Sequence, residues 1–372
     1  MKLALAISSL ASGGAERVMS QLANYWAARG DAVTLITLDS CSSDCYSLDS
    51  RIRRVALGMM GDSRTLFAAL HSNCARMGAL RRAVIDAGAS TVLSFEERTN
   101  VLVLLATEGL PLRRVISERT NPAQHAVGKA WNLLRRLTYP LADALVVQTA
   151  VLRPWARTVM LARQRVEVIP NPVRDMAAFV RNGRRYSQHT IVSVGRLIPA
   201  KGFDVLLTAF ARVAPEFPAW NLAIVGEGPE RGALRRLAES LGIANRATLT
   251  GWLAEPGEML ATASLFVMSS HYEGFPNALV EAMACGLPVI STNWTGSDEI
   301  ITHELDGLLV PVGRSESLGH AMRRVMGDRE MRDRLGQNAL AVRDRYKLSE
   351  ITAIWDAVLT APRSALPAQR VA

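Results

Sequence analysis

Two glutamates, Glu273 and Glu281, lie eight residues apart in the stretch H-Y-E-G-F-P-N-A-L-V-E, which follows an apolar run. Because proline favours a helix start, we expect a helix from Asn277, with Glu273 in the preceding loop and Glu281 a little over one turn into the helix. A carboxylate accepts hydrogen bonds well from two neighbouring hydroxyls, as on a sugar or ribose ring. The spacing predicts that the two acids bind separate parts of one elongated ligand.

The start of this expected helix adds a site for negative charge. The amides of Asn277, Ala278 and Leu279 fall in the first turn, where N–H groups have no partner inside the helix and the helix dipole favours an anion. We therefore expect a diphosphate here, between a sugar at Glu273 and a ribose at Glu281.

A pair of cations follows another apolar run. In S-V-G-R-L-I-P-A-K-G-F-D, Arg196 and Lys201 lie in one loop that ends at Gly202. The forked guanidinium and the movable ammonium both suit a diphosphate, although two solvated surface cations are the alternative. The later turn V-G-E-G-P-E-R is interpreted as structural only.

The first apolar run leads into a glycine turn, S-S-L-A-S-G-G-A-E-R. Gly13 and Gly14 permit close approach of a ligand, and the following helix offers its N-terminus to an anion. The turn lacks the G-x-G-x-x-G pattern, which disfavours dinucleotide binding. A tight strand-to-helix turn without a ligand is the alternative.

Short apolar strands alternate with helices twice along the 372 residues. The pattern predicts an α/β protein with two doubly wound Rossmann-like domains, whose strand ends face a common cleft. We expect the first domain at 1–175 and the second at 186–346. A helix at about 347–361 is expected to pack back on the first domain, and 362–372 to form a flexible tail.

The amino-acid composition limits the class of protein. The chain is 49% hydrophobic and 21% charged, which is typical of a globular protein, and has no apolar run long enough to cross a membrane. The start M-K-L-A-L-A-I-S-S-L is interpreted as a strand rather than a signal peptide. Four cysteines without a zinc-ligand pattern fit a reducing cytoplasm; they are Cys41, Cys45, Cys74 and Cys285.

Positive charge is concentrated in the first half. Residues 1–175 hold 22 basic and 14 acidic residues, a net +8, whereas the remainder carries +1. Such an excess of positive charge favours an anionic partner, with a solvated basic face as the alternative. The sequence contains no nucleic-acid motif or aromatic stacking platform, so no nucleic acid is expected as a partner. Two basic amphipathic stretches predict contact with an anionic membrane, with core packing as the alternative. They are 128–137 and a segment with Leu66, Phe67, Leu70, Met77 and Leu80 among Arg64, Arg76, Arg81 and Arg82.

Taken together, the motifs resemble those of the family 4 retaining glycosyltransferases, which have the two-domain GT-B fold. The resemblance covers nearly the whole chain. It is carried by four motifs: G-G-A-E-R, V-G-R-L-x-x-x-K-G, G-E-G-P-E and E-G-F-P-N-A-L-V-E.

The resemblance implies roles for individual residues. Arg196 and Lys201 would bind the donor diphosphate, Glu273 the transferred sugar and Glu281 the ribose, with Gly14 lining the phosphate and acceptor side. Glu273, Arg196 and Lys201 would be the catalytic residues. No cofactor or metal is implied, and no Asp-x-Asp motif is present; the nucleotide-sugar, a UDP- or GDP-sugar, is a substrate.

One stretch departs from the family pattern. Many members carry a histidine after a first-domain strand, where this chain reads V-I-S-E-R-T-N-P; His125 does not match in register. Gly13, Glu118 and Arg119 are therefore assigned to the acceptor side. This stretch resembles members that build bacterial surface polysaccharides and lipid-linked oligosaccharides.

These observations predict an enzyme that transfers a hexosyl or N-acetylhexosaminyl group to a glycan or a polyprenyl-pyrophosphate-linked saccharide. We expect it in the cytoplasm, peripheral on the inner face of the membrane. A nucleotide-sugar epimerase and a non-catalytic sugar or anion binder are the alternatives.

Overall fold

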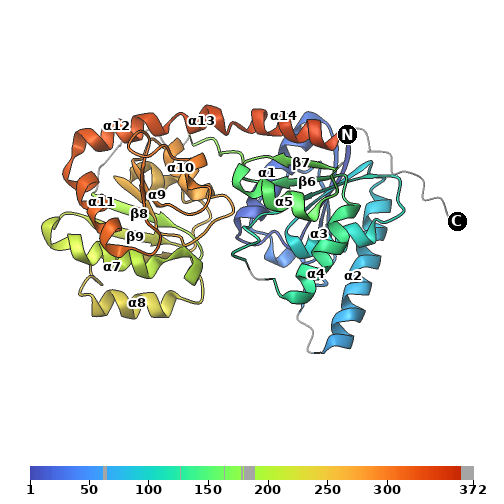
Figure 1. Cartoon of the computed structure of the whole chain (residues 1–372), viewed down its shortest axis with the longest axis horizontal. Helices are drawn as coiled ribbons and strands as arrows, with labels where there is room; N and C mark the ends of the chain where they lie inside the picture. Colours follow the sequence, from blue (N-terminus) through green and yellow to red (C-terminus); the bar gives the residue numbers. More distant parts are fainter. Residues whose placement is uncertain (62–64, 126, 163, 177–178, 180–188, 362–372) are drawn as a thin grey trace. The chain divides into compact units, whose positions relative to one another are not determined.

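A computed structural model describes the chain except residues 62–64, 126, 163, 177–178, 180–188 and 362–372 (Figure 1). The chain forms two compact units: unit 1 comprises Met1–Asn171 with Ser349–Ala372, and unit 2 comprises Pro172–Leu348. The expected tail, Arg64 and most of the stretch between the expected domains lie outside the described residues.

Unit 1 is built on a parallel sheet of seven strands in the order β3-β2-β1-β4-β5-β6-β7. The strands are β1 (Lys2–Ile7), β2 (Ala32–Thr37), β3 (Arg53–Ala56), β4 (Thr91–Phe95), β5 (Arg113–Ser117), β6 (Ala144–Val147) and β7 (Arg165–Val168). Most are continuous buried runs, because helices cover both faces of the sheet (Figure 1). β3 is an edge strand that the sequence did not predict, because R-R-V-A contains no apolar run.

The helices of unit 1 include one from the end of the chain. They are α1 (Gly14–Arg29), α2 (Leu66–Asp86), α3 (Glu97–Ala106), α4 (Lys129–Thr138), α5 (Arg153–Val159) and nearly all of α14 (Leu348–Leu359). The buried Trp355 ring lies 5.9 Å from the Phe95 ring, between centroids. Trp26 Nε1 donates to Asp356 Oδ1 at 2.9 Å, and Arg113 Nε donates to the Val358 carbonyl at 2.7 Å. Helix α14 therefore completes the core of unit 1.

Unit 2 repeats the design with six parallel strands in the order β10-β9-β8-β11-β12-β13. The strands are β8 (Thr190–Val194), β9 (Asn221–Val225), β10 (Ala247–Gly251), β11 (Leu265–Met268), β12 (Val289–Thr292) and β13 (Leu308–Val310). The helices are α7 (Phe203–Val213), α8 (Arg231–Ser240), α9 (Gly257–Thr262), α10 (Asn277–Ala284), α11 (Ser315–Gly327), α12 (Arg329–Ala339) and α13 (Val342–Arg345). Two hydrophobic clusters form the core.

The turn after β9 shows why its glycine is needed. Gly226 has a φ of 152°, and a Cβ placed on it would lie 1.9 Å from the carbonyl oxygen of Gly195, which follows β8. Only glycine lets these two backbone segments approach so closely. The turn thereby supports the loop that carries Arg196 and Lys201.

Candidate active site

In unit 2, the loops after the neighbouring strands β8 and β11 are bonded together at the carboxyl edge of the sheet. The amide of His271 donates to the Ala200 carbonyl at 2.8 Å, and Ser269 Oγ donates to the Lys201 carbonyl at 2.9 Å. Gly202, with φ 59°, permits this approach, since a Cβ there would lie 2.3 Å from the Ser269 carbonyl oxygen. The two loops therefore form one positioned surface.

This surface brings Lys201 and Glu273 into direct contact. Lys201 Nζ lies 2.6 Å from Glu273 Oε1 and 2.8 Å from Oε2, and Ser270 Oγ donates to Oε1 at 2.6 Å. Glu273 is buried, and Lys201 keeps part of its surface exposed. The ammonium compensates the buried carboxylate and still faces solvent on one side.

Arg196 has a different environment, although it lies in the same loop as Lys201. Its side chain is exposed and forms no hydrogen bond or ion pair with the residues that the structure describes. Its five guanidinium N–H donors therefore have no acceptor among the described residues. A residue that binds an anionic ligand needs such available donors.

Glu281 is buried in α10 and lies beside a cation that the sequence analysis missed. Arg174 Nε lies 3.4 Å from Glu281 Oε1, and Arg174 Nη1 lies 3.0 Å from Glu255 Oε2. Arg174 falls in an aperiodic stretch outside every motif. Only one argument could have pointed to this arginine: a buried carboxylate such as Glu281 needs a compensating positive charge nearby.

Helix α10 begins at Asn277, as the sequence predicted, but its first amides are less available than expected. Pro276 occupies the cap position rather than the first helical position. The amide of Asn277 donates to the Phe275 carbonyl at 3.1 Å, and that of Leu279 donates to the Pro276 carbonyl at 3.0 Å. We expected three amides without hydrogen-bond partners. That expectation was wrong for Asn277 and Leu279, because the tight turn at Pro276 supplies carbonyl acceptors for them. Only the Ala278 amide forms no hydrogen bond within the described part of the chain.

In unit 1, an acid lies over the glycine turn after β1. Gly13 caps α1 and Gly14 begins it, and a Cβ placed on Gly13 would lie 2.0 Å from Glu16 Oε2. Tyr46 also donates its hydroxyl to the Gly13 carbonyl at 2.9 Å. A carboxylate of the protein therefore lies beside the N-terminus of α1, where the helix dipole favours negative charge.

Glu118, assigned to the acceptor side, is fully buried after β5. It accepts a hydrogen bond from the Tyr139 hydroxyl at 2.5 Å and lies 3.1 Å from Arg135 Nε. Burial raises the pKa of Glu118 to about 7, and the positive charge of Arg135 opposes that rise. Glu118 is thus an interior residue, and the buried Arg135 does not belong to the outward basic face expected for 128–137.

Arg119, the next residue, is also buried. Its guanidinium lies 4.0 Å from the centre of the Phe95 ring and donates to Asn171 Oδ1, a residue just after β7. Burial lowers the pKa of Arg119 to about 9, while the nearby Glu96 and Glu16 raise it. Arg119 thus lies among acids at the carboxyl edge of the sheet.

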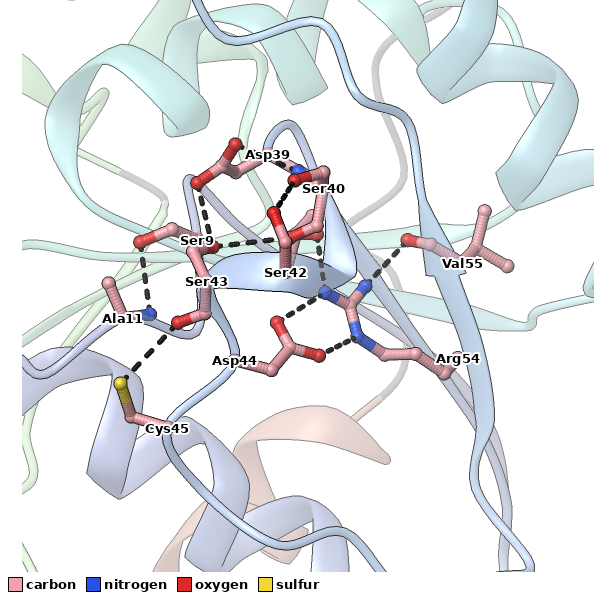
Figure 2. Close-up of polar contacts among 11 residues, drawn as sticks. Ser9, Ala11, Asp39, Ser40, Ser42, Ser43, Asp44, Cys45, Arg54 and Val55 are labelled. Atoms are coloured by element: carbon pink, nitrogen blue, oxygen red, sulfur yellow. Dashed lines mark hydrogen bonds and ion pairs between the residues drawn. The ribbon is translucent and has the colours of Figure 1, made fainter. Parts of the chain in front are cut away.

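A polar loop after β2 borders the same edge (Figure 2). Ser43 Oγ donates to Asp39 Oδ2 at 2.7 Å, and Arg54 binds both Asp44 oxygens at 2.9 and 3.0 Å. The amide of Cys45 donates to the Leu10 carbonyl at 2.9 Å. The loop is therefore fixed beside the glycine turn; the sequence analysis assigned it no role.

Within the residues described above, no three side chains of His, Cys, Asp or Glu gather where a metal ion would bind. No helix in this part of the chain combines the length and apolarity needed to cross a bilayer. All four cysteines are unpaired.

Comparison with solved structures identifies the architecture. Sucrose-phosphate synthase from Thermosynechococcus elongatus matches with a TM-score of 0.79 at 20% identity, over 96% of this chain and 98% of that one. The Anabaena protein HepE in complex with UDP matches with a TM-score of 0.74 at 17% identity, over 97% and 100%. The two parallel sheets are those of a GT-B glycosyltransferase.

Family models then assign the chain. Residues 13–172 match "Glycosyl transferase 4-like domain", and residues 177–342 match "Glycosyl transferases group 1". The protein belongs to this glycosyltransferase family. The family, fold and enzyme class predicted from the motifs are confirmed.

Individual relatives differ in how much they share. An exopolysaccharide phosphotransferase of Streptomyces coelicolor is 35% identical over 267 residues, but the chain spans only 28% of its length. A Campylobacter jejuni α-1,4-N-acetylgalactosaminyltransferase, named for a diphospho-undecaprenol-linked acceptor, is 27% identical over 95% of this chain and 97% of its own. A Rhizobium meliloti lipopolysaccharide core glycosyltransferase, LpsE, is 35% identical over 40% of this chain and 42% of its own.

Proposed function

We propose that the protein transfers a hexosyl or N-acetylhexosaminyl group, with retention, from a UDP- or GDP-sugar to a polyprenyl-pyrophosphate-linked saccharide or related glycan. The observation that carries this proposal is the cluster of Lys201, Glu273 and Ser270, which lie on the two hydrogen-bonded loops after β8 and β11. Two near full-length Campylobacter relatives support the choice of acceptor, since both are named as N-acetylgalactosaminyltransferases acting on diphospho-undecaprenol-linked saccharides.

In this proposal, the donor lies along the carboxyl edge of unit 2. Arg196 and Lys201 bind the diphosphate, and the Glu273 carboxylate accepts from a sugar hydroxyl. Glu281 accepts from the ribose hydroxyls, and the nearby Arg174 orients that carboxylate. Each ligand group thereby meets a side chain of matching chemistry.

The reaction then needs no protein nucleophile. The bond between the anomeric carbon and the diphosphate oxygen breaks as the acceptor hydroxyl attacks from the same face. The hydroxyl proton passes to the departing diphosphate, whose growing negative charge Arg196 and Lys201 stabilise. Positioning and fixed charge supply most of the rate enhancement.

Glu281→Ala is expected to weaken nucleotide binding by about 10- to 100-fold, because hydrogen bonds to a charged group are worth about 1.5–3 kcal/mol. The test is the thermal midpoint of the wild-type protein titrated with UDP, GDP and their sugar conjugates without added metal. The variant should need a correspondingly higher ligand concentration. Glu239→Ala, an exposed site on α8, is the control. Equal affinities would refute the ribose role, and no shift with any nucleotide would refute the donor proposal.

We also propose that α4 lies on an anionic membrane, on its cytoplasmic side. Leu133 and Leu137 are more than half exposed and share one helix face with the exposed Lys129 and Arg136. In the other stretch, Phe67 and Leu70 are exposed but Leu80 is buried, Met77 packs on the core, and Arg76 and Arg81 donate to backbone carbonyls. Helix α4 therefore has the more continuous outward face.

Replacing both Lys129 and Arg136 with serine is expected to reduce binding to phosphatidylglycerol vesicles by about 30-fold, at about 1 kcal/mol for each basic residue. Vesicle co-sedimentation measures this, with phosphatidylcholine vesicles as the uncharged reference. The double variant Arg235→Ser/Arg236→Ser, on α8 of unit 2, removes the same charge elsewhere. Similar losses in both variants would show that only net charge matters and that α4 is not the contact surface.

A further inference from the structure

Glu96 has a backbone conformation that glycine normally occupies. It follows β4 directly and is the N-cap residue of α3, with φ 75° and ψ 142°. Its amide donates to the Ser117 carbonyl at 3.2 Å, and its carbonyl accepts from the Asn100 amide at 2.8 Å. These bonds fix the positive φ, but none of them requires a side chain. Strained residues of this kind concentrate at functional sites.

The Glu96 side chain is held at the carboxyl edge of the unit 1 sheet. Ser8, just after the neighbouring strand β1, donates its hydroxyl to Glu96 Oε2 at 2.5 Å. The Ser8 backbone also contributes a hydrogen bond to the carboxylate, and the residue is partly exposed. The carboxylate is therefore oriented by Ser8 while the residue keeps part of its surface exposed.

A buried cation, Arg119, interacts electrostatically with this carboxylate. The attraction of Glu96 and Glu16 raises the pKa of Arg119, and Arg119 is buried against Phe95 with no hydrogen-bond partner for Nε in the described part of the chain. Burial, together with the charges of Glu16 and Glu97, raises the pKa of Glu96 to about 7, and the Ser8 hydrogen bond opposes the rise. A carboxylate held at a strand edge suits a ligand hydroxyl, which can donate a hydrogen bond to it.

We propose that Glu96, oriented by Ser8 and backed by Arg119, binds the acceptor saccharide by accepting a hydrogen bond from one of its hydroxyls. The inference rests on the proposed function, because it presumes that a saccharide is glycosylated. It gives Glu96 a binding role at the unit 1 edge, where the buried Glu118 does not reach.

The test compares full-length wild type with Glu96→Gln and Glu96→Gly. The donor is UDP-N-acetylgalactosamine, and the acceptor is the diphospho-undecaprenol-linked N-acetylgalactosaminyl-diacetylbacillosamine of the Campylobacter relative. Glu96→Gly should lower kcat/KM for the acceptor by about 10- to 100-fold, mainly through KM, as loss of a hydrogen bond to a charged group predicts. Glu96→Gln should do the same less strongly, and the KM for the donor should not change.

Thermal stability separates binding from folding. Glycine relieves the strained φ, so the melting temperature of Glu96→Gly should equal or exceed that of wild type while the acceptor KM rises. Asp86→Asn, which changes an exposed carboxylate at the end of α2 in the same unit, is the control and should keep the wild-type acceptor KM. The pH dependence of the acceptor KM near neutrality should disappear in Glu96→Gln but persist in the control.

The outcomes are distinguishable. If wild type transfers sugar and Glu96→Gly keeps its acceptor KM, the inference is overturned and the proposed function stands. If wild type transfers nothing from UDP- or GDP-sugars to this acceptor, the proposed acceptor class fails, and the role of Glu96 fails with it.

Discussion

Lys201→Ala is expected to lower sugar transfer by about 10²–10³-fold, the usual loss when one group that stabilises developing negative charge is removed. Lys201 Nζ contacts both oxygens of Glu273, which is buried. The substitution thus removes a positive charge from the proposed diphosphate site and leaves the carboxylate uncompensated. That carboxylate would also repel the departing diphosphate.

The measurement is kcat/KM for the donor, with the thermal midpoint of each variant as a check on folding. Lys347→Ala removes an exposed lysine from the same unit and should leave transfer intact. Lys201 and Glu273 are in contact, so the double variant Lys201→Ala/Glu273→Gln should lose less than the sum of the two single losses. Unchanged transfer in Lys201→Ala would show that Arg196 alone supplies the necessary charge.

The sequence predicted the sheets well where the strands are apolar. Continuous apolar runs such as Leu265–Met268 form strands in the structure, because burial on both faces of a parallel sheet demands apolar residues. The edge strands β3 and β13 were missed, since one is largely polar and the other has only three residues. At an edge, pairing with one neighbour defines the strand, and the local sequence carries little signal.

The site was predictable as a set of residues but not as a set of contacts. The pairing of Lys201 with Glu273 joins positions 72 apart in sequence and depends on the backbone approach at Gly202. Arg135 and Arg136 are adjacent and alike in sequence, yet only Arg135 meets the buried Glu118. The strain at Glu96 has no local signature, because it arises from hydrogen bonds at the end of β4.

Glu118→Gln is expected to remove a pH dependence of stability that wild type shows between about pH 5 and pH 7. The pKa of Glu118 rises from 4.5 to about 7 in the folded protein because of burial. In this window the folded state keeps a proton that the unfolded state loses, so the free energy of unfolding falls as pH increases. At about 1.4 kcal/mol per pKa unit, the loss amounts to roughly 3 kcal/mol.

Glutamine keeps an acceptor for the Tyr139 hydroxyl but does not titrate, so the two proteins differ only in this linkage. Chemical denaturation at several pH values gives the free energy of unfolding of both proteins as a function of pH. Glu96, whose pKa is also raised, is present in both, so the difference between the two curves reports on Glu118 alone. As pH increases, the free energy of unfolding of the variant should rise relative to that of wild type. The difference should become constant above the pKa of Glu118 in the folded state. Parallel curves would mean that Arg135 keeps Glu118 ionised in the folded state, so that the interior holds a permanent ion pair in place of a neutral acid.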